Sequence, residues 1–254
     1  MGDVALLQLR GAPEGGTIEG MVDGRSLVFF PYDGGHAALV GFDLEVKPGP
    51  KAWHLTVLEP SAEPRAVRGK VQVVSRDFPV QRLSLPPGMV DLDPETERRA
   101  AAEAERLRAL YRTITPERLW RGAFTRPVGG TEPGTGFGAR RIINGKPRMP
   151  HGGTDYAAPT GTPVVAVNSG RVALVGDFFF PGRLVAIDHG LGLYTLYFHL
   201  DSVAVSEGDP VERGQTIGTV GATGRATGPH LHFGAHLAGA RIDPATLLVL
   251  SVRD

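Results

Sequence analysis

The sequence predicts a mainly β protein in which two β-domains are joined by a helical segment. Its 35 glycines and 21 prolines separate short apolar runs, as turns separate strands, and they are too many for a helical bundle. Residues 94–112 differ sharply because they are rich in Ala, Glu, Arg and Leu. With 254 residues, the chain can form two small domains that each bury a core. We expect an N-terminal domain at 1–90, a helical connector at 91–122 and a C-terminal domain at 123–254.

The N-terminal part contains short stretches in which apolar and polar residues alternate between Gly, Pro and Asp turns. This pattern predicts a small, Ig-like β-sandwich. The candidate strands are residues 4–9, 26–30, 37–44, 53–58, 70–74 and 81–85.

The middle of the chain has the signals of a helix. Asp93 followed by Pro94 is a good N-cap and first-turn pair, and Leu107, Leu110 and Tyr111 recur at helical spacing. A second helix start is expected at Thr115-Pro116. We interpret this segment as a rigid connector between the two β-domains.

The C-terminal part again reads as strands separated by glycines, at residues 164–167, 171–175, 184–188, 193–200, 215–220 and 231–235. Residues 203–218 are similar to the turn-rich edge of biotinyl and lipoyl carrier domains. A carrier needs a lysine for its covalent cofactor, and the last lysine of the chain is Lys146. The sequence therefore argues against a carrier.

Composition excludes several classes of function. Lys plus Arg number 27 and Asp plus Glu also number 27, so we expect no nucleic-acid partner and no anionic membrane surface. The absence of cysteine excludes thiol catalysis, disulfides and cysteine-based zinc sites. No apolar run is long enough for a membrane span, and the start lacks the features of a secretory signal, as in a mature or trimmed form.

Six of the eight histidines lie after residue 150, and the densest group is PHLHF at 229–233. In a strand, side chains at i and i+2 share a face, so His230 and His232 would project together while Leu231 and Phe233 face the core. An isolated pair of this kind is more often two surface histidines.

A second element is HGGTD at 151–155, where two glycines permit a tight turn that could bring His151 and Asp155 to one point. Alone, it is more often a hydrogen-bonded loop. Together with His232 it supplies three N/O ligands, the number that a catalytic zinc uses while a fourth position stays open. The same set suits non-haem iron, although the usual HxD spacing of that site is not met.

The segment YTLYFHL at 194–200 adds one more histidine. Strict alternation predicts that Thr195, Tyr197 and His199 share one strand face while the apolar residues between them form the core face. His199 would then lie beside His230 if the two strands meet. Two histidines that do not bind the metal would be well placed for proton transfer.

In this order, the motifs resemble the lysostaphin-type, or LytM-like, zinc endopeptidases, whose signature is HxxxD followed far downstream by HxH. The likeness covers about residues 131–246, with HGGTDYAAPTGTPV, IDHGLGLYTLYFHL and GATGRATGPHLHF as its strongest stretches. It implies a lysostaphin-type β-sheet peptidase domain and Zn²⁺ bound by His151, Asp155 and His232. It also implies that His199 and His230 are the catalytic histidines.

The resemblance further implies hydrolysis of peptide cross-links in bacterial peptidoglycan. The N-terminal domain with QRLSLP at 81–86 is similar to that of cell-envelope members. This favours a D-Ala to diaminopimelate bond over a glycine bridge or a stem-peptide bond, and a periplasmic or extracellular location. We expect a monomer that acts on peptidoglycan peptides, with a regulatory envelope protein as a further partner and an N-terminal half able to cover the groove.

The alternative within the same family is a non-catalytic activator of other wall hydrolases, which has lost ligands. All five positions are filled here, and this argues for activity. One departure is the stretch RRIINGKPRMP at 140–150, which lacks the tyrosine that some members carry before the first ligand to steady the oxyanion.

Other polar and aromatic residues are weaker candidates. Arg140, Arg141, Asn144 and Arg148, and the run Phe178-Phe179-Phe180-Pro181, either border the substrate groove or belong to surface and core, with equal weight. We expect His189 to stabilise a turn. His36 and His54, in the other domain, are expected to be structural or surface residues. His236 has the strand parity to extend the histidine row, and we expect it either to support a ligand from behind or to be exposed.

Overall fold

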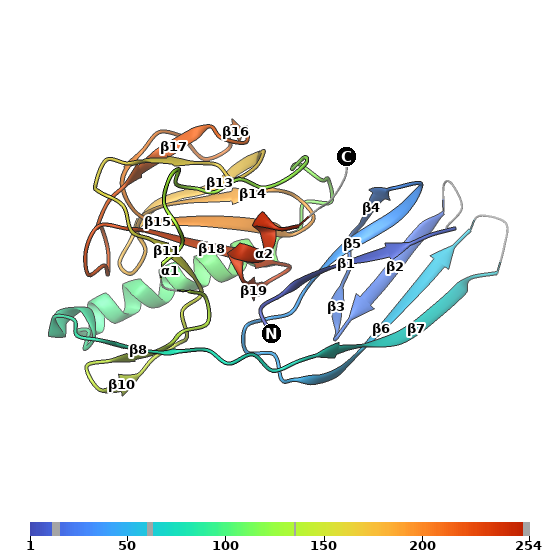
Figure 1. Ribbon diagram of the computed structural model, residues 1–254, viewed down its shortest axis with the longest axis horizontal. Coiled ribbons are helices and arrows are strands. Elements are labelled where there is room, and N and C mark those ends of the chain that lie inside the picture. The colour runs from blue at the N-terminus through green and yellow to red at the C-terminus, as the bar shows by residue number, and fades with distance from the viewer. Residues whose placement is uncertain (12–15, 60–62, 135, 251–254) are drawn as a thin grey trace.

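A computed structural model describes residues 1–11, 16–59, 63–134 and 136–250. Figure 1 shows two β-rich parts side by side, with the strands of the N-terminal part on the right and those of the C-terminal part on the left. The long helix α1 (Pro94–Arg112) runs along the C-terminal part. The predicted mainly β class is confirmed.

The N-terminal part consists of two antiparallel sheets that pack face to face. Residues from both, among them Val22, Val40 and Val73, form one buried cluster. One sheet has the order β1-β5-β4 and the other β3-β2-β6-β7. The strands are β1 (Val4–Leu9), β2 (Thr17–Val22), β3 (Arg25–Ser26), β4 (Phe29–Tyr32), β5 (Gly35–Gly41), β6 (Gly49–Leu58) and β7 (Arg65–Val73).

Strand β2 was not predicted, because Gly20 and a glutamate interrupt its apolar pattern. A Cβ at Gly20 would lie 2.6 Å from the Leu55 side chain and 3.0 Å from the Phe29 ring. The glycine is therefore a point of close packing against the neighbouring strand β6 and against β4 of the other sheet, and not a turn.

The C-terminal part is built on a nine-stranded sheet whose main path runs β11-β18-β15-β14-β13-β16. Strand β17 pairs with β12 and β15, and β19 pairs with β18. The strands are β11 (Gly153–Tyr156), β12 (Pro163–Val165), β13 (Gly170–Phe178), β14 (Gly182–Asp188), β15 (Leu193–Val203), β16 (Pro210–Val211), β17 (Thr216–Val220), β18 (Leu231–Leu237) and β19 (Ala240–Ile242). A short helix, α2 (Pro244–Leu248), follows.

Segments from before and after α1 form a third, small sheet. Strand β8 (Val80–Leu83) pairs in parallel with β9 (Arg140–Ile143), which pairs with β10 (Lys146–Pro147). The turn between β9 and β10 is Asn144-Gly145, whose φ angles of 49° and 76° suit a two-residue hairpin. A single-turn 3-10 helix, η1 (Pro87–Met89), lies between β8 and α1.

Helix α1 begins and ends as predicted, and it covers a sheet face. The Asp93 carboxylate accepts hydrogen bonds from the backbone N–H of Glu95 and Thr96, as an N-cap should. Tyr111 packs on the Tyr194 ring and stacks on His236 with ring centroids 3.8 Å apart. The helix therefore belongs to the C-terminal core and does not merely link two domains. Neither α1 nor another helix in the described ranges has the length and apolar character needed to cross a bilayer.

The second helix expected at Thr115-Pro116 is wrong. The backbone there pairs with the β14–β15 hairpin: Leu191 N–H donates to Thr115 O at 2.6 Å, and Leu119 N–H donates to His189 O at 2.9 Å. The Thr115 hydroxyl also donates to the Asp188 carboxylate at 2.5 Å. These tertiary hydrogen bonds use the groups that a helix would have paired internally.

The two parts share one apolar core. Phe30 of β4 packs edge-on against the buried Trp120 with ring centroids 6.0 Å apart, and both belong to the cluster that fills the C-terminal part. At the edge of this interface, the Arg241 guanidinium forms two hydrogen bonds to the Asp43 carboxylate, at 2.7 and 3.1 Å, and a third to Glu45 at 2.7 Å. The ion pairs of Arg241 thus link the two parts at the edge of their interface.

This ion pair generates a stability prediction. Asp43→Ala should lower the free energy of unfolding by about 1–3 kcal/mol, because the half-buried Arg241 guanidinium would lose its two hydrogen bonds to Asp43 and keep only the exposed Glu45 as a carboxylate partner. Burial opposes ionisation of Asp43, but the hydrogen bonds from Arg241 and from the Glu45 backbone outweigh it and hold its pKa below the usual value. Denaturant titration at several pH values is the measurement.

The pH dependence follows from the sign of that shift. A lowered folded-state pKa stabilises the protein above the ordinary carboxyl pKa of about 3.9, and the contribution is lost as the pH falls through the folded value. The loss caused by Asp43→Ala should therefore be complete at neutral pH and shrink below about pH 4. Glu45→Ala removes an exposed partner of the same arginine and should cost less than about 1 kcal/mol. Equal losses in both variants would contradict the assignment.

Candidate metal centre

Two neighbouring antiparallel strands bring the predicted ligands together. Asp155 of β11 lies opposite His232 of β18 in the strand register, and His151 lies just before β11. A Cβ at Gly153 would lie 2.4 Å from the Phe233 carbonyl oxygen and 2.8 Å from His232 Nε2. Only glycine allows the chain to approach β18 so closely at this point.

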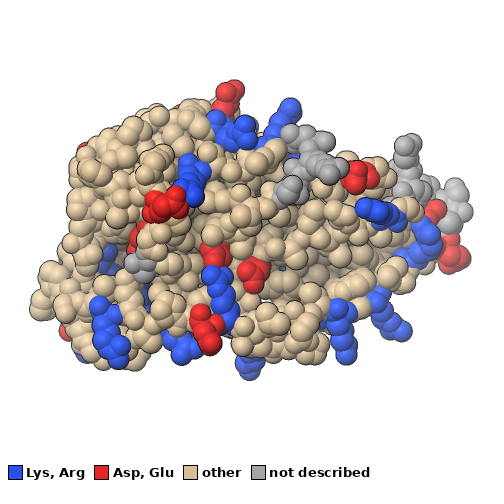
Figure 2. Space-filling model, viewed as in Figure 1, with Lys and Arg blue, Asp and Glu red and all other residues tan. Residues whose placement is uncertain are grey.

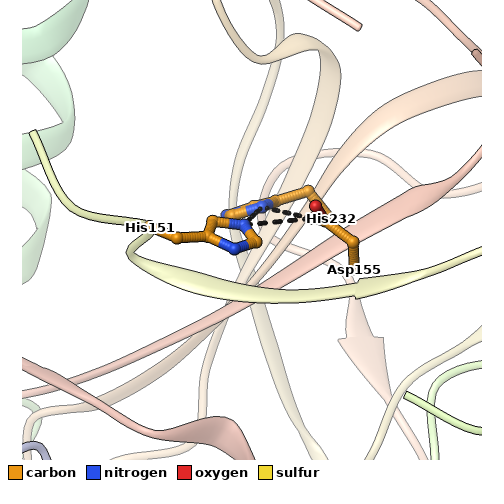
Figure 3. Close-up of side chains that lie close together, drawn as sticks. All are labelled: His151, Asp155 and His232. Atoms are coloured by element: carbon orange, nitrogen blue, oxygen red, sulfur yellow. Dashed lines mark hydrogen bonds and ion pairs between the residues drawn. The ribbon is translucent and has the colours of Figure 1, made fainter. Parts of the chain in front are cut away.

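The three side chains converge on one point, as Figure 3 shows. His151 Nε2 lies 2.8 Å from His232 Nδ1, and Asp155 Oδ1 lies 2.9 Å from His232 Nδ1 and 3.1 Å from His151 Nε2. Zinc bonds of about 2.0–2.1 Å in a tetrahedron place ligand atoms roughly 3.3 Å apart. The cluster therefore needs to open by only a few tenths of an ångström to hold such an ion, and its two nitrogens and one oxygen suit zinc.

The protonation states also suit a metal. Burial lowers the pKa of His151 to about 4, so its imidazole is neutral at neutral pH. Burial alone would raise the pKa of Asp155, but hydrogen bonds from His151 and His232 outweigh it and hold the pKa well below its usual range. Arg141 adds a positive charge 3.6 Å from the other carboxylate oxygen. His151 and Asp155 are thus already deprotonated, as metal ligands must be.

A one-residue bulge places His199 at the cluster. Arg183 pairs with Leu200 while Val185 pairs with Tyr197, so β15 carries one more residue than β14 between these pairs. His199 has a φ of 63°, outside the usual strand range. Beyond it, β15 changes partner from β18 to β17.

The bulge overturns the predicted face of His199. Tyr197 and Leu200, three residues apart, both enter the main core, whereas Leu196 and Phe198 face the cluster covered by α1. Both faces of β15 are therefore buried, and His199 does not continue the row of Thr195 and Tyr197. Its expected neighbour is correct: the rings of His199 and His230 lie 4.7 Å apart.

Both of these histidines present an unprotonated Nε2 when neutral. His199 Nδ1 lies 2.8 Å from the Thr223 carbonyl oxygen, and His230 Nδ1 lies 2.8 Å from that of Gly228. A carbonyl oxygen can only accept, so Nδ1 carries the proton in each ring. His230 Nε2 lies 3.9 Å from Asp155 Oδ1. Burial, together with the nearby His232 and His230, lowers the pKa of His199 to about 3, so it is neutral at neutral pH.

Two cavities that share His199, His232 and two arginines open onto the cluster. One, of about 190 Å³, is bordered by Phe180, Pro181 and Phe198 as well as by His199 and His232. The other, of about 60 Å³, contains Asp155 and His230 and is bordered by Gln81, Leu83 and Leu85 of the N-terminal segment. Arg141 and Arg225 line both. The groove is therefore made from both halves of the chain.

The weaker candidates divide between groove and structure. Arg141 lines the cavities at the cluster. The Arg148 guanidinium lies 3.4 Å from the Val90 carbonyl oxygen and borders a separate, wider cavity beside α1. Asn144 forms two hydrogen bonds to the Leu85 backbone and so holds the hairpin after β9. In the aromatic run, Phe178 is core, and Phe180 and Pro181 border the groove.

The remaining histidines have other surroundings. His189 is fully buried and bonded to the Ser169 carbonyl oxygen and the Thr195 hydroxyl, so it stabilises the hairpin as expected. His236 continues the β18 row but stacks under Tyr111 and is neither exposed nor near the ligands. His36 and His54 lie in the N-terminal sheets.

Sequence reasoning missed two contributors to the site. Phe198 stacks on the His232 ring, with centroids 5.3 Å apart and planes 14° from parallel. Arg225 lies over the Phe180 ring, with its Cζ 4.0 Å from the centroid. The only signal for Arg225 was a lone cation among small residues four positions before the PHLHF strand.

The region that holds the cluster is similar to a known protein family. Residues 149–244 match the model of a family described as Peptidase family M23. A segment is 47% identical over 85 residues to peptidoglycan DD-endopeptidase ShyB of Vibrio cholerae, which is 34% of this chain and 20% of that protein. A similar segment is 45% identical over 97 residues to DD-carboxypeptidase/endopeptidase Mpg of Neisseria meningitidis, 38% of this chain and 22% of that protein. The chain thus spans about a fifth of the length of these curated relatives.

One solved structure is similar over nearly the whole chain. It is the crystal structure of a putative peptidase M23 from Pseudomonas aeruginosa, at 33% sequence identity and a TM-score of 0.76. The alignment covers 97% of this chain and 93% of that one. The likeness therefore includes the N-terminal sheets and α1 as well as the region that holds the cluster.

The cluster predicts how metal content should respond to substitution. Asp155→Ala or His232→Ala removes one of three ligands, and zinc content by elemental analysis should fall from about one equivalent per chain to near zero after dialysis. His54→Ala, an exposed histidine in the N-terminal sheet, is the matched control and should keep the metal. Full zinc retention by both ligand variants would rule out this cluster as the metal site.

Proposed function

The chain belongs to peptidase family M23, and from this premise we propose that it is a zinc-dependent endopeptidase that hydrolyses peptide cross-links of bacterial peptidoglycan. The observation that carries the proposal is a three-ligand cluster with two further histidines beside it in one groove. Peptide hydrolysis needs an activated water and a proton relay, and these five side chains supply the residues for both.

His151 Nε2, Asp155 Oδ1 and His232 Nδ1 would hold the zinc ion. Bound there, the metal would lower the pKa of a water molecule to about 7 and polarise a peptide carbonyl. Arg141 orients the Asp155 carboxylate from its other oxygen, 3.6 Å away. Phe198 stacks on His232 and holds its ring plane.

His199 and His230 are the proposed proton-transfer residues. Each donates its Nδ1 proton to a backbone carbonyl, and this leaves Nε2 free to accept a proton from an attacking water. Once protonated, either ring can donate to the developing oxyanion or to the leaving amine. No serine or cysteine nucleophile is required, in keeping with a chain that has no cysteine.

The substrate is proposed to be a D-Ala to diaminopimelate cross-link. ShyB is a peptidoglycan DD-endopeptidase and Mpg is a DD-carboxypeptidase/endopeptidase, and the activities of these two similar proteins support this choice. Such a substrate implies a periplasmic or extracellular location. A monomer and a regulatory envelope partner remain predictions. Charges of both signs are interspersed on the face in Figure 2, in keeping with the predicted lack of a nucleic-acid partner.

The alternative of a non-catalytic activator lacks support. That reading requires lost ligands or lost histidines, whereas all five side chains are present and converge. His230 Nε2 lies 3.9 Å from Asp155 Oδ1, which is beyond hydrogen-bond distance, and within the described residues no hydrogen bond reaches the Nε2 of His199.

Separating metal binding from turnover tests the proposal. His199→Ala should retain zinc, because His199 is not among the three ligands, and should lower turnover by about 10²–10⁴-fold, the usual contribution of a general acid or base. The measurement is release of muropeptides from purified sacculi, with mass spectrometry to identify the bond cut. His54→Ala should match the wild type in both assays.

Three results would count against the proposal. Near-normal turnover by His199→Ala would remove its catalytic role. A zinc-loaded wild-type protein that releases no peptide from sacculi would remove the activity itself. Products that still carry intact D-Ala to diaminopimelate bonds would show that this cross-link is not the substrate.

A further inference from the structure

Arg225 has a fixed position in the groove. It lies between β17 and β18, where Gly182 and Gly224 allow two loops to touch: a Cβ at Gly224 would lie 2.2 Å from Gly182 N and 2.6 Å from Phe180 O. The Arg225 N–H donates to Phe180 O at 3.0 Å, and its guanidinium lies over the Phe180 ring at 4.0 Å. Backbone and side chain are thus both held, and this restricts the guanidinium before any ligand arrives.

The guanidinium lacks a carboxylate partner. Within the described ranges, no ion pair or side-chain hydrogen bond reaches its nitrogens. Burial and the neighbouring cations Arg141 and Arg148 lower its pKa to about 10. It remains charged at neutral pH. Arg141 and Arg225 line both cavities that open onto the cluster, and Arg141 has the Asp155 carboxylate 3.6 Å away. Of these two arginines, Arg225 is the one without a carboxylate partner among the described residues.

Its place is next to the proposed chemistry. Arg225 borders both cavities that open onto the cluster, one together with His199 and His232 and the other with Asp155 and His230. It also borders a wider groove of about 620 Å³ beside Ala100, Ala101 and Ala104 of α1. A ligand group bound by Arg225 would therefore lie between the scissile bond and a channel with room for the rest of a peptide.

A guanidinium of this kind selects for a carboxylate. Its parallel N–H groups match the two carboxylate oxygens, and a half-buried site strengthens the pair. Peptidoglycan peptide bonds differ in whether the carbon attached to the scissile nitrogen carries a carboxylate. This carbon carries one when the amine comes from diaminopimelate or from a terminal D-Ala. It carries none when the amine comes from a lysine side chain or from the interior of a glycine bridge.

We propose that Arg225 is a specificity residue that binds the carboxylate on the leaving-amine side of the scissile bond. The substrate class is then a D-alanyl amide whose leaving amine carries an α-carboxylate. This inference rests on the proposed peptidase function and narrows it, because it excludes glycine-bridge and lysine-type cross-links as preferred substrates.

The experiment uses two synthetic cross-linked dimers that differ only in this group, which is a free carboxylate in one and a primary amide in the other. The zinc-loaded wild-type full chain should cleave the carboxylate dimer with about 10–100-fold higher kcat/KM, as expected for a charge-assisted hydrogen bond. Arg225→Gln should lose this preference, because its kcat/KM should fall for the carboxylate dimer and stay unchanged for the amide dimer. Arg225→Lys, which keeps the charge without the planar fork, should keep part of it.

A matched control and a binding measurement exclude a merely structural role. Arg213→Gln removes an exposed arginine that hydrogen-bonds to the Ala123 carbonyl oxygen away from the groove, and it should keep the preference. Calorimetric titration of the zinc-loaded His199→Ala protein should show tighter binding of the carboxylate dimer, and adding Arg225→Gln should abolish that difference.

Each remaining outcome overturns a defined statement. Equal wild-type rates on both dimers, or an Arg225→Gln variant that slows both dimers equally, would overturn the role of Arg225 and leave the peptidase function standing. A zinc-loaded wild type that cleaves neither dimer and releases nothing from sacculi would overturn the peptidase function, and this inference with it.

Discussion

The antiparallel pairing of β11 with β18 is the constraint on which the site depends. Because Asp155 lies opposite His232 in this register, the carboxylate and the imidazole come within 2.9 Å without help from a flexible loop. Gly153 lets the backbones close up, and the turn before it delivers His151 to the same point. A shift of one residue would send His232 to the core face and Phe233 to the groove. The fully buried Leu231 and Phe233 make that shift costly, so core packing fixes the positions of the proposed metal ligands.

Charge is arranged around this cluster so that burial does not protonate it. A carboxylate in a half-buried site would ordinarily become harder to ionise, yet Asp155 accepts hydrogen bonds from two imidazoles and faces Arg141. The same burial keeps His151 and His199 neutral. Arg141 and the neighbouring imidazoles thus stabilise the Asp155 carboxylate, and a divalent ion would find an ionised carboxylate and a neutral imidazole in place. Arg225, which lines both cavities beside the cluster, stays charged at neutral pH because its pKa is lowered only to about 10.

Sequence reasoning was strongest where local chemistry and tertiary structure agree. Strand β1 and helix α1 have the predicted bounds, because the alternation and the Asp93 cap are local signals that nothing later overrides. The spacing of HGGTD and PHLHF likewise indicated which side chains converge. It failed where long-range partners decide: Thr115 bonds to a hairpin more than 70 residues away, and Gly20 packs between strands. The position of His199 depends on the point at which β15 changes neighbours, and no local pattern marks that point.

That bulge also explains why the site departs from strand rules at the position where chemistry is proposed. A regular strand would carry His199 into the core beside Tyr197, where its ring could reach neither the ligands nor solvent. The extra residue turns the ring toward His230, and the Pro181 carbonyl oxygen accepts its backbone N–H at 2.8 Å, which repays part of the strain of a positive φ. Pro181 belongs to the loop that carries Phe180, which in turn supports Arg225. The backbone irregularity that positions His199, the proposed proton-transfer residue, is therefore hydrogen-bonded to the loop that supports Arg225, the proposed carboxylate-binding residue. A change in that loop should therefore move both side chains.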